Sequence, residues 1–128
     1  MNGHDLQLAA VARAKSLPDA ALEHPFGPEW DVYKVRGRVF MLLTTLDGQP
    51  IVTLKVAPED AKALCAEYEQ IAPGYHMNKR HWITLSGGDA IDAALVDELV
   101  TESFLLVVEK LPRARRPIGL PQRGGAPG

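Results

Sequence analysis

The feature that most constrains the fold of this chain is a run of three strand-forming segments joined by two very short turns, DVYKVRGRVFMLLTTLDGQPIVTLKV. Residues 31–35, 38–45 and 50–56 are rich in Val, Tyr, Phe, Ile and Thr, which strands favour. Arg36-Gly37 and Asp47-Gly48 stand between them as turn signals. Because so short a turn returns the chain alongside the strand that it has just left, these segments predict consecutive antiparallel hairpins.

Three helices are expected around these strands. Residues 5–16 place apolar side chains at helical spacing until Pro18 stops the pattern. Residues 58–70 begin with a proline, which suits a first helical turn, and carry acids beside it at the positive end of the helix. Residues 91–111 have apolar residues on one side and acids mostly on the other, and Pro112 ends the segment.

Two further segments complete the order of elements. Residues 22–30, LEHPFGPEW, contain two prolines and a glycine, so they predict an extended entry to the sheet with Phe26 plugging the core. Residues 75–77 and 81–86 are expected to be strands on either side of the turn NKR. The resulting order, α-β-β-β-α-β-β-α, predicts a two-layer α+β fold with a five-stranded antiparallel sheet and helices on one face.

The length and the charge distribution define a body and a tail. A chain of 128 residues suits one domain, which we expect to span residues 1–112. Residues 113–128, RARRPIGLPQRGGAPG, carry four Arg and no acid, whereas the preceding residues hold 10 Lys and Arg against 16 Asp and Glu. The tail is also rich in Pro and Gly, so we expect it to be disordered or draped over the surface, as a solubilising end or a nucleic-acid arm.

Nothing in the sequence predicts a membrane or an export route. The apolar runs are far shorter than the roughly 18 residues that span a bilayer, and the N-terminus has no basic-then-apolar signal pattern. The single cysteine, Cys65, lies at an apolar helical position and has no partner for a disulfide within the chain. We therefore expect a soluble protein of the cytoplasm.

The stretch GYHMNKRHW is the richest in chemically active side chains. If Asn78 and Lys79 form the two-residue turn of a hairpin, His76 and His81 become a direct cross-strand pair with Cβ atoms roughly 5 Å apart. Lys79 and Arg80 then project charge from the tip, and Asn78 can donate from its amide. Polar turn tips need no ligand, so an ordinary surface hairpin remains the alternative.

The other tight turn is also basic, because Arg36 and Arg38 flank it. Two hairpins that both end in cations suit phosphate oxygens, which Arg binds with two parallel hydrogen bonds and Lys as a point charge. Tyr75 and Trp82 could stack on an exposed base, although a strand tryptophan is more often part of a core. Lys55 is open to a structural role, a pairing with an acid, or a place on the same basic face.

Metal and cofactor chemistry is disfavoured. A zinc site needs about four ligands, and the two histidines have no Cys or acid near them in sequence. No glycine pattern of a nucleotide-binding loop occurs. An enzyme that uses a pocket around His76 and His81, with Tyr75 and Lys55, stays open as a minority alternative. We predict no cofactor, no metal and no catalytic residue.

Four segments together resemble the MmcQ/YjbR family of small bacterial proteins. They are HPFGPEWDVYKV (24–35), TLKVAPEDA (53–61), PGYHMNKRHW (73–82) and VVEKLPR (107–113), the last from a closing helix that also holds Ser103. The resemblance covers about residues 5 to 113, and PGYHMNKRHW is its most specific part. It implies a fold similar to type III secretion chaperones and a DNA-binding role through a double wing of two hairpins.

The sequence thus predicts weak, salt-sensitive DNA contact through the hairpin tips. A module that binds protein or peptide, as secretion chaperones do, is the alternative. The expected phosphate-contacting residues are Arg36, Arg38, His76, Asn78, Lys79, Arg80 and His81, with Tyr75 and Trp82 for stacking.

Overall fold

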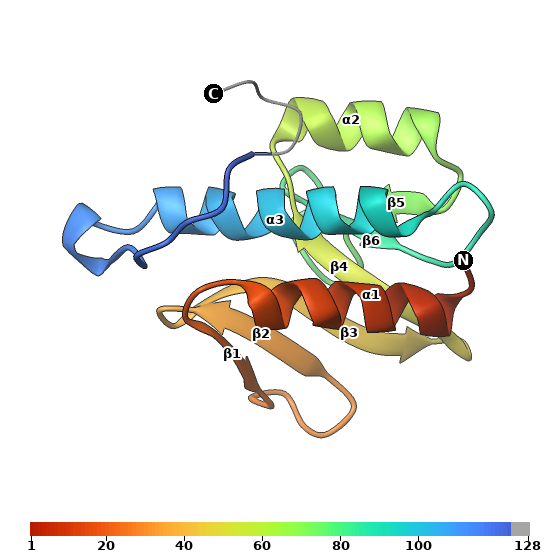
Figure 1. Cartoon of the computed structure of the whole chain (residues 1–128). Coiled ribbons are helices and arrows are strands. Elements are labelled where there is room, and N and C mark those ends of the chain that lie inside the picture. The colour runs from red at the N-terminus through yellow and green to blue at the C-terminus, as the bar shows by residue number, and fades with distance from the viewer. Residues whose placement is uncertain (124–128) are drawn as a thin grey trace.

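Figure 1 shows the computed structural model of the chain, which describes residues 1–123. These residues form one six-stranded sheet in the order β1-β2-β3-β4-β6-β5, and every neighbouring pair is antiparallel. The strands are β1 (Ala20–Glu23), β2 (Asp31–Val35), β3 (Arg38–Leu46), β4 (Gln49–Lys55), β5 (Ile71–Pro73) and β6 (Trp82–Leu85). The predicted α+β class and antiparallel sheet are confirmed, with six strands in place of five.

The additional strand, β1, forms one edge of the sheet and comes directly before the proline-containing segment in the chain. Its sequence, AALE, has no β-branched or aromatic residue, so nothing local indicates a strand. It is defined by pairing with β2, from Ala20 opposite Val35 to Glu23 opposite Val32.

Two helices, α1 (Gly3–Ser16) and α3 (Ala93–Glu109), pack side by side on one face of the sheet (Figure 1). The third helix, α2 (Pro58–Glu67), packs beside β5 at the opposite edge from β1. The Asn2 side chain accepts a hydrogen bond from Asp5 N and the Asp92 side chain accepts one from Leu95 N, so both long helices begin with a capped turn.

The main core lies between the two long helices and the sheet. Leu6, Ala10 and Ala14 of α1 are fully buried. Because they are spaced four residues apart, they lie on one face of the helix, the face that packs into the core. Phe104 of α3 meets Phe40 of β3 edge to face, with ring centroids 5.4 Å apart.

A β-bulge interrupts β3 at Phe40. Tyr33 pairs with Met41 and Lys34 pairs with Val39, so Phe40 has no opposite residue on β2. Phe40 and Met41 both join the helix-facing core, which requires this irregularity because successive residues of a regular strand point to opposite faces. The bulge thereby lets one strand supply two consecutive core side chains.

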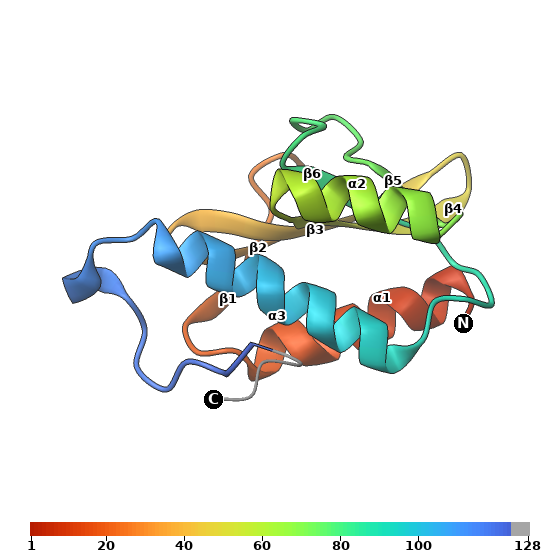
Figure 2. The same cartoon turned by 90° about the horizontal axis from the view of Figure 1, so that it is seen from above.

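Two loops cover the other face of the sheet, as Figure 2 shows, where both project from the side away from α1 and α3. They are residues 24–30, between β1 and β2, and residues 74–81, between β5 and β6. A buried row runs across the sheet beneath them, made by directly paired residues of four strands: Val32, Leu42, Thr53 and Thr84. This face is therefore a second, smaller packing layer.

The predicted hairpin at Asn78-Lys79 is wrong. Because β5 ends at Pro73 and β6 begins at Trp82, residues 74–81 form a long loop, and His76 and His81 are not a cross-strand pair. Gly74 N donates to Trp82 O across the base of the loop at 2.8 Å, and His76 has the left-handed φ of +57°, which no regular strand allows.

The predicted core position of Phe26 is also wrong, since 61% of this residue is exposed. The turn before β2 depends on Gly27, whose φ of +102° favours glycine. Phe26 is thereby held on the outside of the loop and does not reach the core between the sheet and the helices.

The described part of the predicted tail runs back along α3. Arg116 Nε donates to Leu111 O at 3.0 Å, and Arg123 forms ion pairs with Glu102 and Glu109 of the helix. Residues 124–128 of the tail lie outside the described residues. Within the part of the chain that the structure describes, no helix is long and apolar enough to cross a membrane.

Candidate functional site

The strand register gathers cationic side chains at one end of the sheet. β2 ends and β3 begins there, with Val35 opposite Arg38, and β4 ends where β6 begins, with Lys55 opposite Trp82. Lys110, the residue that caps the C-terminus of α3, comes to the same end. We call the resulting hollow of about 280 Å³ the cationic recess; it is lined by Arg38, Val39, Lys55, Trp82, Val107 and Lys110.

The charges of the cationic recess are not neutralised by any residue that the structure describes. Among residues 1–123, none of Arg38, Lys55 and Lys110 lies within ion-pair distance of a carboxylate. Burial lowers the pKa of the Lys55 ammonium, and the positive charges of Lys110 and Arg38 lower it further. An anion in the recess would reverse this destabilisation of the charged amine.

Arg36 behaves differently although it is only two residues from Arg38. Its guanidinium forms an ion pair with Asp19 at 3.0 Å, and its backbone has the left-handed φ of +50° at the β2–β3 turn. The predicted basic tip of this hairpin therefore holds one arginine with an ion-pair partner and one without a partner among residues 1–123.

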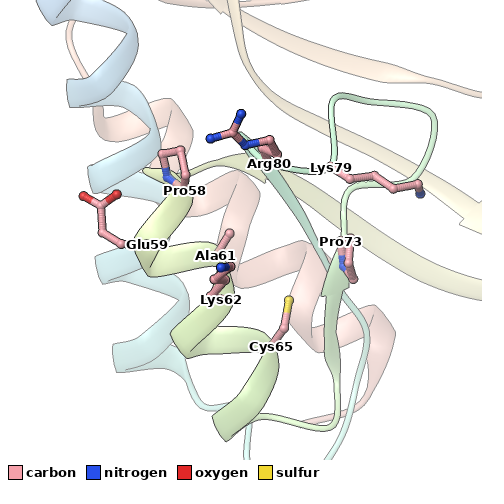
Figure 3. Close-up of a pocket in the computed structure, with 8 residues that line it drawn as sticks. All are labelled: Pro58, Glu59, Ala61, Lys62, Cys65, Pro73, Lys79 and Arg80. Carbon is pink, nitrogen blue, oxygen red and sulfur yellow. The ribbon is translucent and has the colours of Figure 1, made fainter.

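Lys79 and Arg80 line a groove against α2. The groove has a volume of about 550 Å³ and also contains Pro58, Glu59, Ala61, Lys62, Cys65 and Pro73. Figure 3 shows the two cations on the loop opposite α2, with the side chain of Lys79 extending away from the helix. Burial raises the pKa of the Cys65 thiol, which keeps it protonated and a poor nucleophile at neutral pH.

Aromatic side chains from the two covering loops form a third feature, on the sheet face opposite the helices. Trp30 and Tyr75 stack with an interplanar angle of 13° and centroids 6.5 Å apart, and the rings of Tyr75 and His76 lie 4.0 Å apart. We call the hollow beside them the aromatic recess; its volume is about 250 Å³ and its lining is Phe26, Trp30, Leu42, Thr53, Tyr75, His76 and Met77.

Hydrogen bonds fix both loops around the aromatic recess. His24 Nε2 lies 2.8 Å from Asp31 Oδ1, which ties the start of the first loop to β2. Thr44 Oγ1 donates to Glu29 O at 2.7 Å. In the second loop, Tyr75 N donates to Thr84 Oγ1 at 2.9 Å, and the Thr84 and Thr53 hydroxyl oxygens are 3.0 Å apart.

The remaining predicted residues have local roles. Asn78 accepts a hydrogen bond from Arg80 N at 2.9 Å, so its side chain shapes the loop. The His81 carbonyl accepts from Val56 N at 2.9 Å while the residue itself is exposed. His76 lines the aromatic recess and His81 does not, so the structure does not bring the two histidines into one pocket.

The predicted site residues are thus divided among three places. Arg38 and Trp82 line the cationic recess, Lys79 and Arg80 line the α2 groove, and Tyr75 and His76 line the aromatic recess. Lys110, Phe26 and Trp30 line the recesses but were not among the predicted site residues. Lys110 lies beyond the end of a helix with no local signal, whereas Phe26 and Trp30 were visible as aromatics in a loop that contains two prolines.

Comparison with known proteins identifies the family of the chain. The family model described as YjbR matches residues 15–106. The Escherichia coli O157:H7 protein YbdF is 42% identical over 113 residues, covering 88% of this chain and 93% of that protein. The Escherichia coli K12 protein YjbR is 30% identical over 83 residues, covering 65% of this chain and 70% of that protein.

Solved structures show the same fold. The crystal structure of the Deinococcus radiodurans protein DR2400, described with the family domain DUF419, superposes with a TM-score of 0.77 at 34% identity, covering 100% of this chain and 96% of that one. A crystal structure of a Pseudomonas syringae protein superposes with a TM-score of 0.67 at 28% identity, covering 83% of this chain and 98% of that one.

Proposed function

The chain belongs to the YjbR family, and we propose that it binds the phosphate groups of nucleic acid at the cationic end of its sheet. The observation that supports this proposal is the cationic recess. It brings Arg38, Lys55 and Lys110 together without a carboxylate partner among the described residues. A phosphate group carries the charge and the acceptor oxygens that such a cluster requires.

The environment of Lys55 explains why the recess suits an anion. Burial and two neighbouring cations lower its pKa, so the surrounding protein groups disfavour a charged Lys55. A bound phosphate would raise that pKa again and would offset the repulsion among the three cations. Trp82 offers a flat indole face at the same place, on which a sugar or base next to the phosphate can pack.

The two wings contribute unequally in this proposal. The β2–β3 turn contributes Arg38, because Asp19 already neutralises Arg36. The β5–β6 loop contributes Lys79 and Arg80, both of which are exposed. We therefore infer that nucleic acid runs across the end of the sheet from Arg38 toward Arg80.

The affinity should be low and strongly dependent on salt. The net charge of the chain is −2, so attraction must come from this local cluster. Each phosphate that a cation neutralises releases counterions, which gives a slope of about one unit in log K against log salt per contact.

The test compares two arginines of the same turn. Arg38→Ala should weaken binding to labelled duplex and single-stranded DNA by about tenfold at low salt and reduce the salt slope by about one unit. Arg36→Ala is the matched control, because it removes an equal charge from a side chain that is already paired with Asp19. Its effect should be several-fold smaller.

Two further variants separate the contributions of the second wing and the tail. Lys79→Ala/Arg80→Ala should reduce the slope by up to ~2 units, and by the same factor for unrelated sequences. Arg113→Ala/Arg115→Ala removes the same number of charges from the tail. Absence of binding by the unmodified protein at low salt would refute the proposal, as would equal losses in Arg36→Ala and Arg38→Ala.

The same proposal places the protein in the cytoplasm. Nucleic acid is present there, and a single unpaired cysteine remains reduced in that compartment. Fractionation of cells that produce the tagged protein tests this, and recovery in an exported fraction would contradict it.

A further inference from the structure

We propose that the aromatic recess is a binding site for one planar heteroaromatic ring of the nucleobase type. The inference concerns the sheet face opposite the helices. It does not depend on the phosphate contacts proposed for the end of the sheet.

The recess has the shape that a ring requires. Trp30 and Tyr75 come from different loops, yet their planes differ by only 13°, so they present nearly parallel faces. Phe26 lies at the rim on the first loop. The volume of about 250 Å³ is below the roughly 300–1,000 Å³ of pockets for drug-sized ligands, which limits the occupant to a single small ring system.

The recess is mostly apolar, and the polar side chain that it offers to a ligand is the imidazole of His76, which favours a heteroaromatic ring over a hydrocarbon side chain. Thr53 lies at the floor, but it is almost completely buried and its hydroxyl pairs with that of Thr84, so it closes the recess without offering a group to a ligand. The imidazole of His76 can act as a donor or an acceptor at the wall. A base offers ring nitrogens and exocyclic groups to this imidazole.

The exposed position of Phe26 is the observation that most strongly supports a ligand in the recess. This large apolar side chain is 61% exposed, although its loop is tied down by the His24–Asp31 contact and by the bond from Thr44 to Glu29 O. Stacking a ring against Phe26 would remove that apolar surface from water. Because the loop is already fixed, binding would cost little ordering entropy.

The backbone on the other wall supports the same conclusion. His76 is held at a φ of +57°, an uncommon conformation for a residue other than glycine. It aims the imidazole at the Tyr75 ring, with centroids 4.0 Å apart, and keeps both residues on the recess.

The experiment uses adenosine, which has a base and no phosphate. The chain has two tryptophans, so the Trp82→Phe protein leaves Trp30 as the only indole fluorophore. Adenosine should quench Trp30 fluorescence saturably, with an apparent Kd in the range of about 1 mM or below. The quenching should persist in high salt, since no charge is involved.

Phe26→Ala in the same background should weaken adenosine binding by about tenfold or more, which is the effect of losing one base-stacking partner. This variant should fold normally because Phe26 is exposed. Leu22→Ala is the matched control: Leu22 is 45% exposed on the neighbouring strand and does not line the recess. It should leave the Kd unchanged.

Three results would overturn the inference: no saturable quenching up to the solubility limit of adenosine, equal Kd values for Phe26→Ala and Leu22→Ala, or tighter binding of N-acetylphenylalaninamide, which would indicate a site for a protein side chain. Arg38→Ala separates this inference from the proposed phosphate contacts, because it should leave adenosine binding intact. A pair of short single strands, one with an adenine and one abasic at the same position, distinguishes a base within a strand from a free nucleoside.

Discussion

Ser103→Ala should destabilise the whole domain, although it removes only one oxygen atom. Ser103 lies in the middle of α3 and is completely buried. Its hydroxyl donates to Phe40 O at 2.6 Å and accepts from Lys55 N at 2.8 Å. The side chain thus joins the helix to two adjacent strands at once.

The position of Ser103 explains why both bonds are needed. Pairing between β3 and β4 ends at Met41 and Leu54, immediately before the bulge at Phe40. Lys55 N and Phe40 O are the next groups along these strands, and the serine hydroxyl bridges them. Alanine has no polar atom there, so a buried carbonyl and a partly buried N–H lose their partner.

The expected loss of unfolding free energy follows from the number of backbone groups that are left without a partner. A buried polar group left without a partner costs about 1–3 kcal/mol, and two such groups that relax partially give a loss of about 2–4 kcal/mol in the free energy of unfolding. Urea denaturation measures this directly. With an m-value of roughly 1–3 kcal/mol/M for a small domain, the midpoint should fall by about 1 M or more while m stays unchanged.

Ser16→Ala is the control. The Ser16 hydroxyl is exposed and donates to Arg13 O within its own helix, so the loss should be within about 0.5 kcal/mol. A loss below about 1 kcal/mol in Ser103→Ala, at unchanged m, would refute the reasoning. It would show that Lys55 N and Phe40 O can pair directly once the hydroxyl is gone.

Two other predictions concern the charge of Lys55 and the close approach of Gly74 to Trp82. The pKa of Lys55 is lower in the folded protein than in the unfolded chain. Between that pKa and about 10.4, the folded protein therefore binds fewer protons than the unfolded chain. The contribution of Lys55 to the free energy of unfolding consequently rises as the pH rises through this window. Burial would still lower the pKa of Lys55 in Lys110→Met, but loss of the Lys110 charge should raise it, as measured by NMR titration of the Lys55 Cε resonance. An unchanged pKa would contradict the contribution of the Lys110 charge. Gly74→Ala should lower the unfolding free energy by about 1–3 kcal/mol, because the added Cβ would lie 2.6 Å from Trp82 Cβ; thermal stability equal to that of the unmodified protein would show that the loop can move without cost.

The sequence predicted those parts of the fold that local chemistry determines. The expected strand over residues 31–35 is confirmed as β2, and the expected strand over 38–45 differs from β3 by one residue at its end. Glycine-containing turns bound these strands, so their limits are local properties. Pro58 likewise marks the start of α2.

The β5–β6 loop could not be predicted in the same way. Tyr75 and Met77 have strand-forming side chains, and Asn78-Lys79 resembles a turn, so the local signal favours a hairpin. The actual loop depends on the contact of Gly74 with Trp82 and on the hydrogen bond from Tyr75 N to Thr84. These are properties of the assembled sheet, and they override local propensity.

The sequence indicated which residue types form the site, but it did not indicate which of them lie together in space. Arg38 and Trp82 are far apart in sequence from Lys110, and only the strand register and the length of α3 bring them to one end of the sheet. The pairing of Arg36 with Asp19 also depends on the turn after α1, where Asp19 has the left-handed φ of +59°. A count of basic residues cannot distinguish a neutralised arginine from a free one.

All four segments that resemble the YjbR family contribute residues to the two recesses. Segments 24–35 and 73–82 supply Phe26, Trp30 and most of the aromatic recess, whereas segments 53–61 and 107–113 supply Lys55 and Lys110 to the cationic recess. A fold by itself requires buried apolar residues and suitable turns, and it does not require an exposed phenylalanine or three neighbouring cations that have no carboxylate partner among residues 1–123. The loop 74–81 joins the two recesses, because Trp82 directly follows it at one and Tyr75 lies on it at the other.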